Sequence, residues 1–349
     1  MRKFMLKMSF LLVPVAAMLV YYMSYEKSGG DLNRLGKISV EKNYRDIFKS
    51  DFKTEKKYME ISDVDLKTTG RIDILVVGDS FSRQKNYGYQ NYLACMSGRE
   101  VVNIDNLGYN AITDDPVRML CFLAAGDLFD KIKIRYVILQ NVERAIVKRG
   151  GDIDAKTNVS LNELNDLYYN RQKIKEKTDS APGLGIFQDA ADYFLFSILY
   201  KFNDRAYFSQ VYKEELTEKL FSIKKNELLF YYEDVKNIKY STKEAVDALN
   251  EKLNVLSEKL GSKGVKLIVL PSPDKYDLYC GYIKNNILPV NHFFENMKNK
   301  NKGYIYLDTK DILIAHIKEG EKDIYFADDT HWSPAAAKII AGEIYKRLK

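Results

Sequence analysis

The chain has 349 residues, of which 46% are hydrophobic and 29% are charged, and its formal net charge is only +6. This composition excludes a disordered tail and a polytopic membrane protein, and the length suffices to bury a core without disulfides or metals. The positive charges are scattered, so nucleic acid is not an expected partner. Three cysteines lack Cys-x-x-Cys spacing and three histidines lie far apart, so we expect neither a metal site nor another cofactor.

The N-terminus has the features of a membrane-targeting segment. Arg2, Lys3 and Lys7 precede an uncharged run over residues 8–25. As a helix this run would span about 27 Å, close to the ~30 Å hydrocarbon core of a bilayer. Basic residues before such a run predict a single-pass signal anchor over residues 1–25, in the cell membrane, with the body outside the cytoplasm. A cleaved signal peptide, which would give a secreted protein, is the alternative, although the run lacks a clean Ala-x-Ala site.

Residues 26–70 are polar and charged and predict a tether and lead-in to a domain over residues 71–349. In that domain short apolar runs alternate with helical patterns, as in a doubly wound parallel α/β sheet of the flavodoxin-like kind. Strands are expected at residues 72–77, 101–104, 136–139, 265–270 and 304–307, and helices at residues 89–97, 115–123, 242–260 and 334–348. The stretch 145–240 interrupts the alternation, and we expect an insertion of mixed helices and loops over the sheet edge or the functional site.

Gly78-Asp79-Ser80 is the first candidate for chemistry, because it follows the first predicted strand of this domain and precedes a helical stretch. In an open α/β sheet such a turn lies at the carboxyl edge of the strands, where sites gather. A serine hydroxyl there is a poor nucleophile until a neighbouring base takes its proton, and that base needs an orienting carboxylate. Alone, the three residues are a weak signal for catalysis and more often form an Asp/Ser helix cap.

The second candidate is the run from Asp328 to Pro334, Asp-Asp-Thr-His-Trp-Ser-Pro, which precedes the last predicted helix. His331 follows Asp328 by three positions and Asp329 by two, and either carboxylate could hold the tautomer of the imidazole. The loop before the last helix also opens at the carboxyl edge of a doubly wound sheet. We therefore expect Ser80 and His331 to lie together in the fold, with a simple helix-capping role as the alternative for each.

Together, and in this order, the two blocks resemble the SGNH (GDSL-type) hydrolases. The resemblance covers residues 72–141 and 265–348. It implies that Ser80 is the nucleophile, that His331 is the general base and that Asp328 is the partner in the family's Asp-x-x-His block.

The same resemblance implies an oxyanion site made by a glycine after the second strand and an asparagine after the third. Gly108, within Asn-Leu-Gly-Tyr-Asn, fits the glycine block, and Asn141 is the asparagine candidate. The family's Gly-x-Asn-Asp block is altered here to Gln-Asn-Val-Glu-Arg over residues 140–144. Arg144 in this block is a candidate for binding a charged substrate, with an ordinary surface ion pair as the alternative.

Within the superfamily, Asp-Thr-His-Trp-Ser-Pro is similar to the Asp-x-His-Trp block of alginate O-acetyltransferase-like proteins. There the aspartate two positions before the histidine orients it, which favours Asp329 over Asp328. The segment from Leu270 through Lys275 to Tyr279 also resembles their Pro-x-Lys…Tyr stretch and makes both residues candidates for substrate binding. The chain departs from those proteins in order, because its serine precedes the Asp-x-His block.

The resemblance implies a membrane-anchored, extracytoplasmic O-acyltransferase, most simply an O-acetyltransferase, that modifies a cell-surface polysaccharide through an acyl-Ser80 intermediate. Its partners would be a polysaccharide acceptor, an acyl donor supplied by a membrane acyltransferase, and the membrane through the N-terminal helix. A carbohydrate or small-ester esterase, which uses water as the acceptor, is the second hypothesis. A non-catalytic module that binds glycan or a partner protein is the third, and the altered block over residues 140–144 is its main support.

Overall fold

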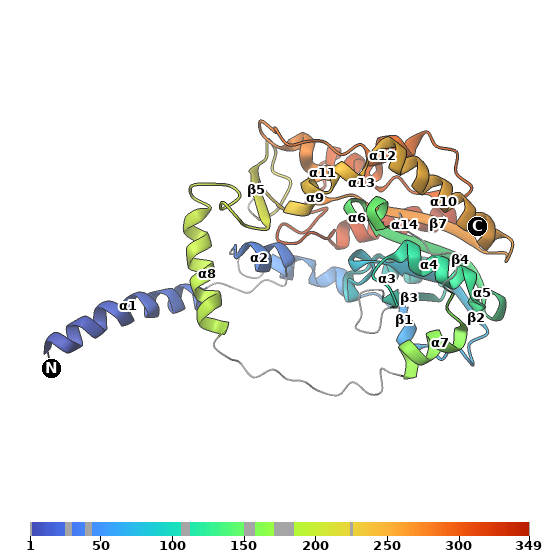
Figure 1. Ribbon diagram of the computed structural model, residues 1–349, viewed down its shortest axis with the longest axis horizontal. Helices are drawn as coiled ribbons and strands as arrows, with labels where there is room; N and C mark the ends of the chain where they lie inside the picture. Colours follow the sequence, from blue (N-terminus) through green and yellow to red (C-terminus); the bar gives the residue numbers. More distant parts are fainter. Residues whose placement is uncertain are drawn as a thin grey trace.

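The computed structural model describes residues 2–24, 30–38, 44–105, 112–149, 158–170, 185–223 and 226–348. Six parallel strands form its central sheet in the order β1-β3-β2-β4-β7-β8 (Figure 1). The strands are β1 (Met59–Glu60), β2 (Arg71–Gly78), β3 (Val101–Asp105), β4 (Lys133–Val142), β7 (Lys266–Ser272) and β8 (Ile305–Tyr306). The parallel α/β sheet predicted from the sequence is confirmed, and β1 is an edge strand that the sequence did not predict.

Helices cover both faces of the sheet because the central strands are apolar on both sides. In β2, Ile74 and Val76 join one buried cluster, and Leu75 and Val77 join the other. The first cluster is completed by α3 (Tyr89–Ser97), α13 (Thr309–Lys318) and α14 (Pro334–Arg347). The second is completed by α4 (Pro116–Ala125), α10 (Lys243–Gly261) and α12 (Phe293–Lys298). This is the three-layer arrangement that a continuous apolar strand requires.

The remaining helical elements are shorter or lie outside these layers. The α-helices are α1 (Arg2–Ser24), α2 (Asp31–Gly36), α5 (Leu128–Lys131), α6 (Glu143–Arg149), α7 (Leu161–Asn165), α8 (Gly185–Leu199), α9 (Tyr232–Lys236) and α11 (Lys275–Tyr279). The 3₁₀-helices are η1 (Tyr44–Phe52), η2 (Ile61–Asp63), η3 (Ser80–Ser82), η4 (Lys85–Tyr87), η6 (Ile238–Tyr240) and η7 (Cys280–Tyr282), and η5 (Asp166–Asn170) is a short π-helix.

The stretch predicted as an insertion of helices and loops also contains an antiparallel hairpin, β5 (Val211–Glu215) and β6 (Glu227–Tyr231). Leu228 and Phe230 on β6 are buried in the first core cluster. Phe230 packs on Tyr276 of α11 with ring centroids 5.0 Å apart. The hairpin therefore holds the end of the stretch 145–240 beside the segment that follows β7.

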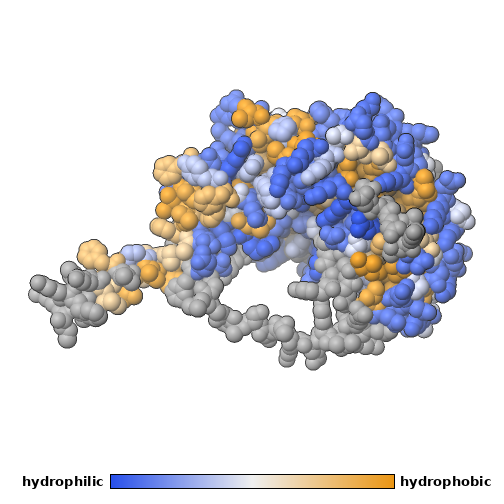
Figure 2. Space-filling view, viewed as in Figure 1, coloured by the Kyte–Doolittle hydropathy of each residue, from blue (hydrophilic) through white to orange (hydrophobic). Residues whose placement is uncertain are grey.

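Helix α1 extends away from the sheet and meets the rest of the molecule at α8 (Figure 1). At this contact the rings of Tyr22 and Tyr193 lie 5.6 Å apart. Figure 2 shows apolar side chains gathered along α1 and over α8, where Phe194 and Leu195 are exposed. Within the described residues no helix is both long enough and apolar enough to cross a membrane, so the membrane anchor stays a prediction.

The turn after β2 is tightly packed at Gly78. A Cβ atom at this position would overlap the side chain of Ser82 and come within 2.8 Å of Gln140 Oε1. Both neighbours are fixed, because the Ser82 hydroxyl donates a hydrogen bond to Gln140 Oε1 at 2.9 Å. Glycine is therefore required here for close approach.

We predict that Gly78→Ala lowers the free energy of unfolding by about 2 to 3 kcal/mol, because the added methyl group overpacks a buried site. Gly261→Ala is the matched control, since the space around Gly261 is open and alanine favours the helix. Denaturant unfolding of both variants measures the difference. Equal stability of the two variants would contradict the packing described for Gly78.

Candidate active site

The carboxylate of Asp79 shapes the turn that carries Ser80. One of its oxygens accepts a hydrogen bond from the Phe81 amide at 3.1 Å, and the other accepts from the Val142 amide at 2.6 Å. Asp79 thereby ties the start of η3 to the end of the neighbouring strand β4. Ser80 is partly exposed at the first position of η3. The same turn thus contains a side-chain cap, made by Asp79, and a partly exposed hydroxyl, that of Ser80. The interpretation of Gly-Asp-Ser as a helix cap is therefore compatible with its interpretation as a nucleophile turn.

Gln140 supports the same turn from β4 and was missed in the sequence analysis. Its Oε1 atom accepts hydrogen bonds from the Asp79 amide at 3.0 Å and the Ser82 hydroxyl at 2.9 Å. Its Nε2 atom donates to the Ser272 hydroxyl on β7 at 3.0 Å. The available signal was a polar residue at the end of an otherwise apolar strand, where its amide must find partners inside the protein.

His331 lies near the tip of a narrow loop before α14. Tyr325 and Trp332 form an antiparallel bridge across its base, and the Phe326 amide donates to the His331 carbonyl at 3.2 Å. Beyond the loop, Ser333 caps α14 by accepting from the Ala335 amide. This closure fixes the backbone on both sides of the Asp-Asp-Thr sequence.

Asp329 is the carboxylate that contacts the imidazole of His331. The distance between Asp329 Oδ1 and His331 Nδ1 is 2.6 Å, and the same oxygen accepts from the His331 amide at 3.1 Å. Its other oxygen accepts from Arg45 at 3.1 Å. Because an ionised carboxylate can only accept, the Nδ1 atom carries the proton and Nε2 is left as the acceptor.

Asp328 is buried on the other side of the loop, where it pairs with Arg45 at 2.8 Å. Its carbonyl accepts hydrogen bonds from the Leu32 and Asn33 amides at 3.1 and 3.2 Å. These three contacts are with the N-terminal segment. Of the two aspartates left open by the sequence, the geometry favours Asp329 as the residue that orients His331.

The protonation of this pair follows from its surroundings. Burial lowers the pKa of His331, but the negative charges of Asp329 and then Asp31 outweigh burial and raise that pKa above its usual value. Burial raises the pKa of Asp329, but His331 and Arg45 hold it well below its usual value. Asp329 is therefore ionised at neutral pH, as an orienting carboxylate must be.

Phe81 brings the serine turn and the histidine loop together. Its ring centroid lies 4.7 Å from that of His331 and 4.9 Å from that of Trp332. Phe81 directly follows Ser80, so the predicted meeting of the two blocks occurs through this aromatic contact. Among the described residues, His331 Nε2 has no hydrogen-bond partner. The nitrogen that would take the serine proton is thus unoccupied, although no hydrogen bond joins it to Ser80.

Lys275, expected to contact a substrate, is fully buried instead. Its ammonium group donates to the carbonyls of Phe326, Ala327 and Asp329 at 2.7, 3.0 and 3.1 Å. Burial lowers the pKa of Lys275 to about 8. This is a correction to the sequence analysis: the lysine holds the backbone of the histidine loop and is not exposed to a ligand.

Tyr279 is also fully buried, so its assignment to substrate binding is corrected in the same way. Its hydroxyl accepts from the Tyr325 amide at 3.2 Å, at the base of the histidine loop. The Tyr325 hydroxyl in turn donates to the Pro273 carbonyl at 2.6 Å. The Pro-x-Lys…Tyr stretch and the Asp-x-His-Trp block therefore form one packed unit.

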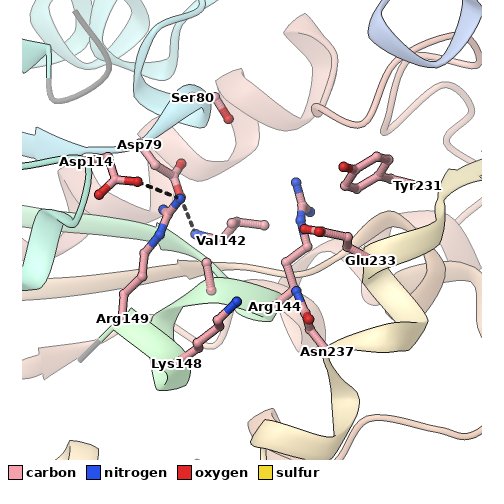
Figure 3. Close-up of a pocket in the computed structure, with 11 residues that line it drawn as sticks. Asp79, Ser80, Asp114, Val142, Arg144, Lys148, Arg149, Tyr231, Glu233 and Asn237 are labelled. Carbon is pink, nitrogen blue, oxygen red and sulfur yellow. Dashed lines mark hydrogen bonds and ion pairs between the residues drawn. The ribbon is translucent and has the colours of Figure 1, made fainter. Parts of the chain in front are cut away.

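Arg144 lines a pocket of about 380 Å³ that Ser80 also lines, and its role in binding a charged substrate stays a prediction. The pocket is lined by Asp79, Ser80, Asp114, Val142, Arg144, Ala145, Lys148, Arg149, Tyr231, Glu233 and Asn237. Figure 3 shows Ser80 and Asp79 on one side, Tyr231 and Glu233 on the other, and the guanidinium of Arg144 between them. Arg144 also pairs with two buried carboxylates, those of Asp234 at 3.3 Å and Asp274 at 2.5 Å.

Of the two residues expected at an oxyanion site, the structure describes only Asn141. Gly108 lies outside the described residues. Asn141 is fully buried near the end of β4, and neither atom of its amide group has a hydrogen-bond partner among the described residues. Its role in an oxyanion site stays a prediction.

The N-terminal lead-in contributes residues that the sequence analysis did not assign to the site. Asp31 at the start of α2 accepts from the Thr330 amide at 2.7 Å and from its hydroxyl at 2.5 Å. Tyr44 in η1 accepts from the Ala327 amide at 2.7 Å. These contacts join residues about 300 positions apart in sequence. The local sequence of the polar lead-in contains no pattern that indicates such distant partners.

Asp31, Asp329 and His331 offer ligand atoms within 4.8 Å of one another, close enough to hold a cation. Their atoms are already engaged, however, in the His331–Asp329 and Asp31–Thr330 hydrogen bonds. We therefore interpret the group as a hydrogen-bonded network around the imidazole.

The parallel six-stranded sheet with helices on both faces fits the fold of an SGNH hydrolase-like domain. Residues 225–349 match the family model described as the SGNH hydrolase-like domain of the acetyltransferase AlgX. The resemblance stated from the sequence is thereby confirmed over the part of the chain that contains Lys275, Tyr279 and the histidine loop, and Ser80 lies before it. No curated protein matches the chain.

We predict that Asp329→Asn lowers turnover of an acyl ester by about 10⁴-fold, because the amide disturbs the tautomer of His331. Asp328→Asn should change turnover far less, since its contact is with Arg45. Its expected effect is a lower melting temperature. Steady-state kinetics and thermal melts of the two variants separate these outcomes. A large kinetic loss confined to Asp328→Asn would reverse the assignment.

Proposed function

We propose that the chain is an O-acyltransferase, most simply an O-acetyltransferase, that modifies a polysaccharide through an acyl-Ser80 intermediate. The observation that carries this proposal is the orientation of His331. Its Nδ1 atom donates to Asp329 at 2.6 Å, its Nε2 atom has no partner among the described residues, and its ring packs on the residue after Ser80. An oriented imidazole with its Nε2 atom unpartnered beside the serine turn supports a role for His331 as the base of a serine nucleophile. The match of residues 225–349 to an acetyltransferase domain supports the same class of reaction.

In the first half-reaction, Ser80 Oγ attacks the carbonyl carbon of the acyl donor while its proton moves to His331 Nε2. The bond between the acyl carbon and the donor's leaving oxygen then breaks, and that oxygen takes the proton from His331. In the second half-reaction, a sugar hydroxyl gives its proton to His331 and attacks the acyl-Ser80 carbonyl. Ser80 leaves and recovers its proton, so no other reactant is consumed. Asp329 stabilises the imidazolium formed in each half.

The pocket beside Ser80 favours a sugar acceptor over water alone. Tyr231, Glu233 and Asn237 from the stretch 145–240 form its wall opposite the serine turn (Figure 3). Aromatic and polar side chains together are suited to stack on a sugar ring and to bond its hydroxyls. An esterase would share the first half-reaction and use water in the second, so the acceptor distinguishes these two functions. A binding module would form no acyl-enzyme.

We further propose that the domain works outside the cytoplasm and that residues 1–25 attach it to a membrane, where a membrane acyltransferase would supply the acyl donor. The basic residues before the uncharged run support this orientation. The exposed apolar side chains of α1, among them Phe10 and Val13, are suited to contact lipid.

This orientation predicts that protease added to cells without an outer barrier degrades the body of the chain. Proteolysis followed by immunoblotting of a C-terminal tag is the measurement, with a cytoplasmic protein as the control. A body that resists protease until the inner membrane is lysed would contradict the proposed location.

We predict that Ser80→Ala lowers acyl transfer by four orders of magnitude or more, about as the loss of a serine nucleophile does elsewhere. The assay supplies the full chain with an activated acetyl ester, with and without acetyl-free oligosaccharides, and measures acetylated sugar and free acetate. Acetylated sugar formed only by the wild-type chain is the expected result. Acetate released at the same rate with every acceptor would establish the esterase instead. Transfer retained by Ser80→Ala would contradict the nucleophile assignment.

A further inference from the structure

Asp31 connects the N-terminal segment to the histidine loop through Thr330, the residue between Asp329 and His331. Its two carboxylate oxygens accept separately from the Thr330 amide at 2.7 Å and the Thr330 hydroxyl at 2.5 Å. The next two amides of α2, those of Leu32 and Asn33, donate to the Asp328 carbonyl. The first turn of α2 thus binds the tip of the loop at consecutive residues.

The carboxylate of Asp31 also faces the imidazole. Asp31 Oδ2 lies 3.9 Å from His331 Nδ1, the ring nitrogen that donates to Asp329. Two carboxylates from segments about 300 positions apart therefore share one side of the same ring. Both of Asp31's hydrogen bonds are ones that it accepts, as the ionised form requires.

We propose that Asp31 is a second positioning carboxylate for His331, which fixes the loop through Thr330 and stabilises the positive charge that forms on the imidazole. This inference rests on the proposed function for its catalytic consequence. Asp31 acts through His331 and Thr330, and it is not among the described residues that line the pocket beside Ser80. The N-terminal lead-in would then be part of the working site, outside the residues matched by the family model.

The other charges around the ring explain why a second carboxylate is tolerated. The ionisable groups near His331 are Asp329 and Asp328 of its own loop, Asp79 of the serine turn, Arg45 of η1 and Lys275 of α11. Arg45 lies between the two loop aspartates, at 2.8 Å from one and 3.1 Å from the other. Its guanidinium also lies over the Phe326 ring, 3.7 Å from the centroid.

These cations offset the carboxylates of the loop. In the described part of the chain, the cationic partner of Asp31 within ion-pair distance is His331 itself, at 3.9 Å when the imidazole is protonated. Burial and the charge of Asp329 raise the pKa of Asp31, and His331 lowers it. The interaction is reciprocal, so ionised Asp31 favours the charged form of the imidazole. Removing this charge must therefore lower the pKa of His331.

The test is a titration of His331 by NMR in the full chain, comparing wild type with Asp31→Asn. Asparagine keeps the size of the side chain and can still bond Thr330, so the change is mainly one of charge. The chain has only three histidines, and a His331→Gln sample assigns the resonance. We expect a lower titration midpoint in Asp31→Asn and about tenfold lower kcat for acyl transfer.

Two further variants distinguish charge from folding. Asp31→Glu keeps the charge and should restore the midpoint towards that of wild type. Asp46→Asn removes one charge from the same lead-in at an exposed pair with Lys49, and should leave both midpoint and kcat unchanged. Thermal melts of all variants identify any that fail to fold.

An unchanged His331 midpoint in a folded Asp31→Asn variant would overturn the inference, whatever happens to kcat. A midpoint that falls equally in Asp46→Asn would also overturn it, because the effect would not be specific to Asp31. A midpoint that falls only in Asp31→Asn, in a protein whose wild type transfers no acyl group, would support the coupling and contradict the proposed function. The two claims therefore fail separately.

Discussion

The hydrogen bond of 2.6 Å between His331 Nδ1 and Asp329 is the interaction on which the rest of the site depends, and it needs a loop whose backbone is held in place. A loop tip usually has water for its backbone carbonyls and is correspondingly mobile. Here the buried ammonium of Lys275 donates hydrogen bonds to three of these carbonyls. Residues of η1 and α2 form hydrogen bonds with further backbone groups of the loop. These hydrogen bonds from protein groups hold the backbone of the loop in place.

Such a loop requires charges to be buried as a balanced set. Burying one unpaired charge in a protein interior costs several kcal/mol of free energy. Removing one member of a buried ion pair leaves the other as such an unpaired buried charge. Arg45 and Lys275 offset Asp328 and Asp329, and burial still lowers the pKa of Lys275 to about 8. The Phe81 ring, packed on both His331 and Trp332, sets this charged loop against the serine turn. The same few residues therefore form both the hydrogen bonds and ion pairs of the buried polar groups and the aromatic contacts that position the loop.

The sequence predicted the parallel sheet well because its strands, such as Ile72–Val77, are apolar runs whose burial does not depend on distant context. The sequence also indicated that Ser80 and His331 lie at the same edge of the sheet, because each stands next to a recognisable helix start, and their catalytic roles stay predictions. The substrate-binding roles predicted for Lys275 and Tyr279 were wrong. A charged or hydroxyl group in a motif indicates that the side chain has a polar partner, but it does not show whether that partner is a substrate or the backbone. Asp31 and Arg45 were missed because their contacts cross almost the whole chain.

The central claim is that Ser80 receives the acyl group with His331 as its base. Its most direct test is mass spectrometry of the full chain after brief exposure to an activated acetyl ester without acceptor, followed by peptide mapping. The account predicts one acetyl group on the peptide that contains Ser80, lost when an oligosaccharide acceptor is added. Turnover of the ester with no adduct at Ser80, or with the acetyl group on another residue, would contradict it.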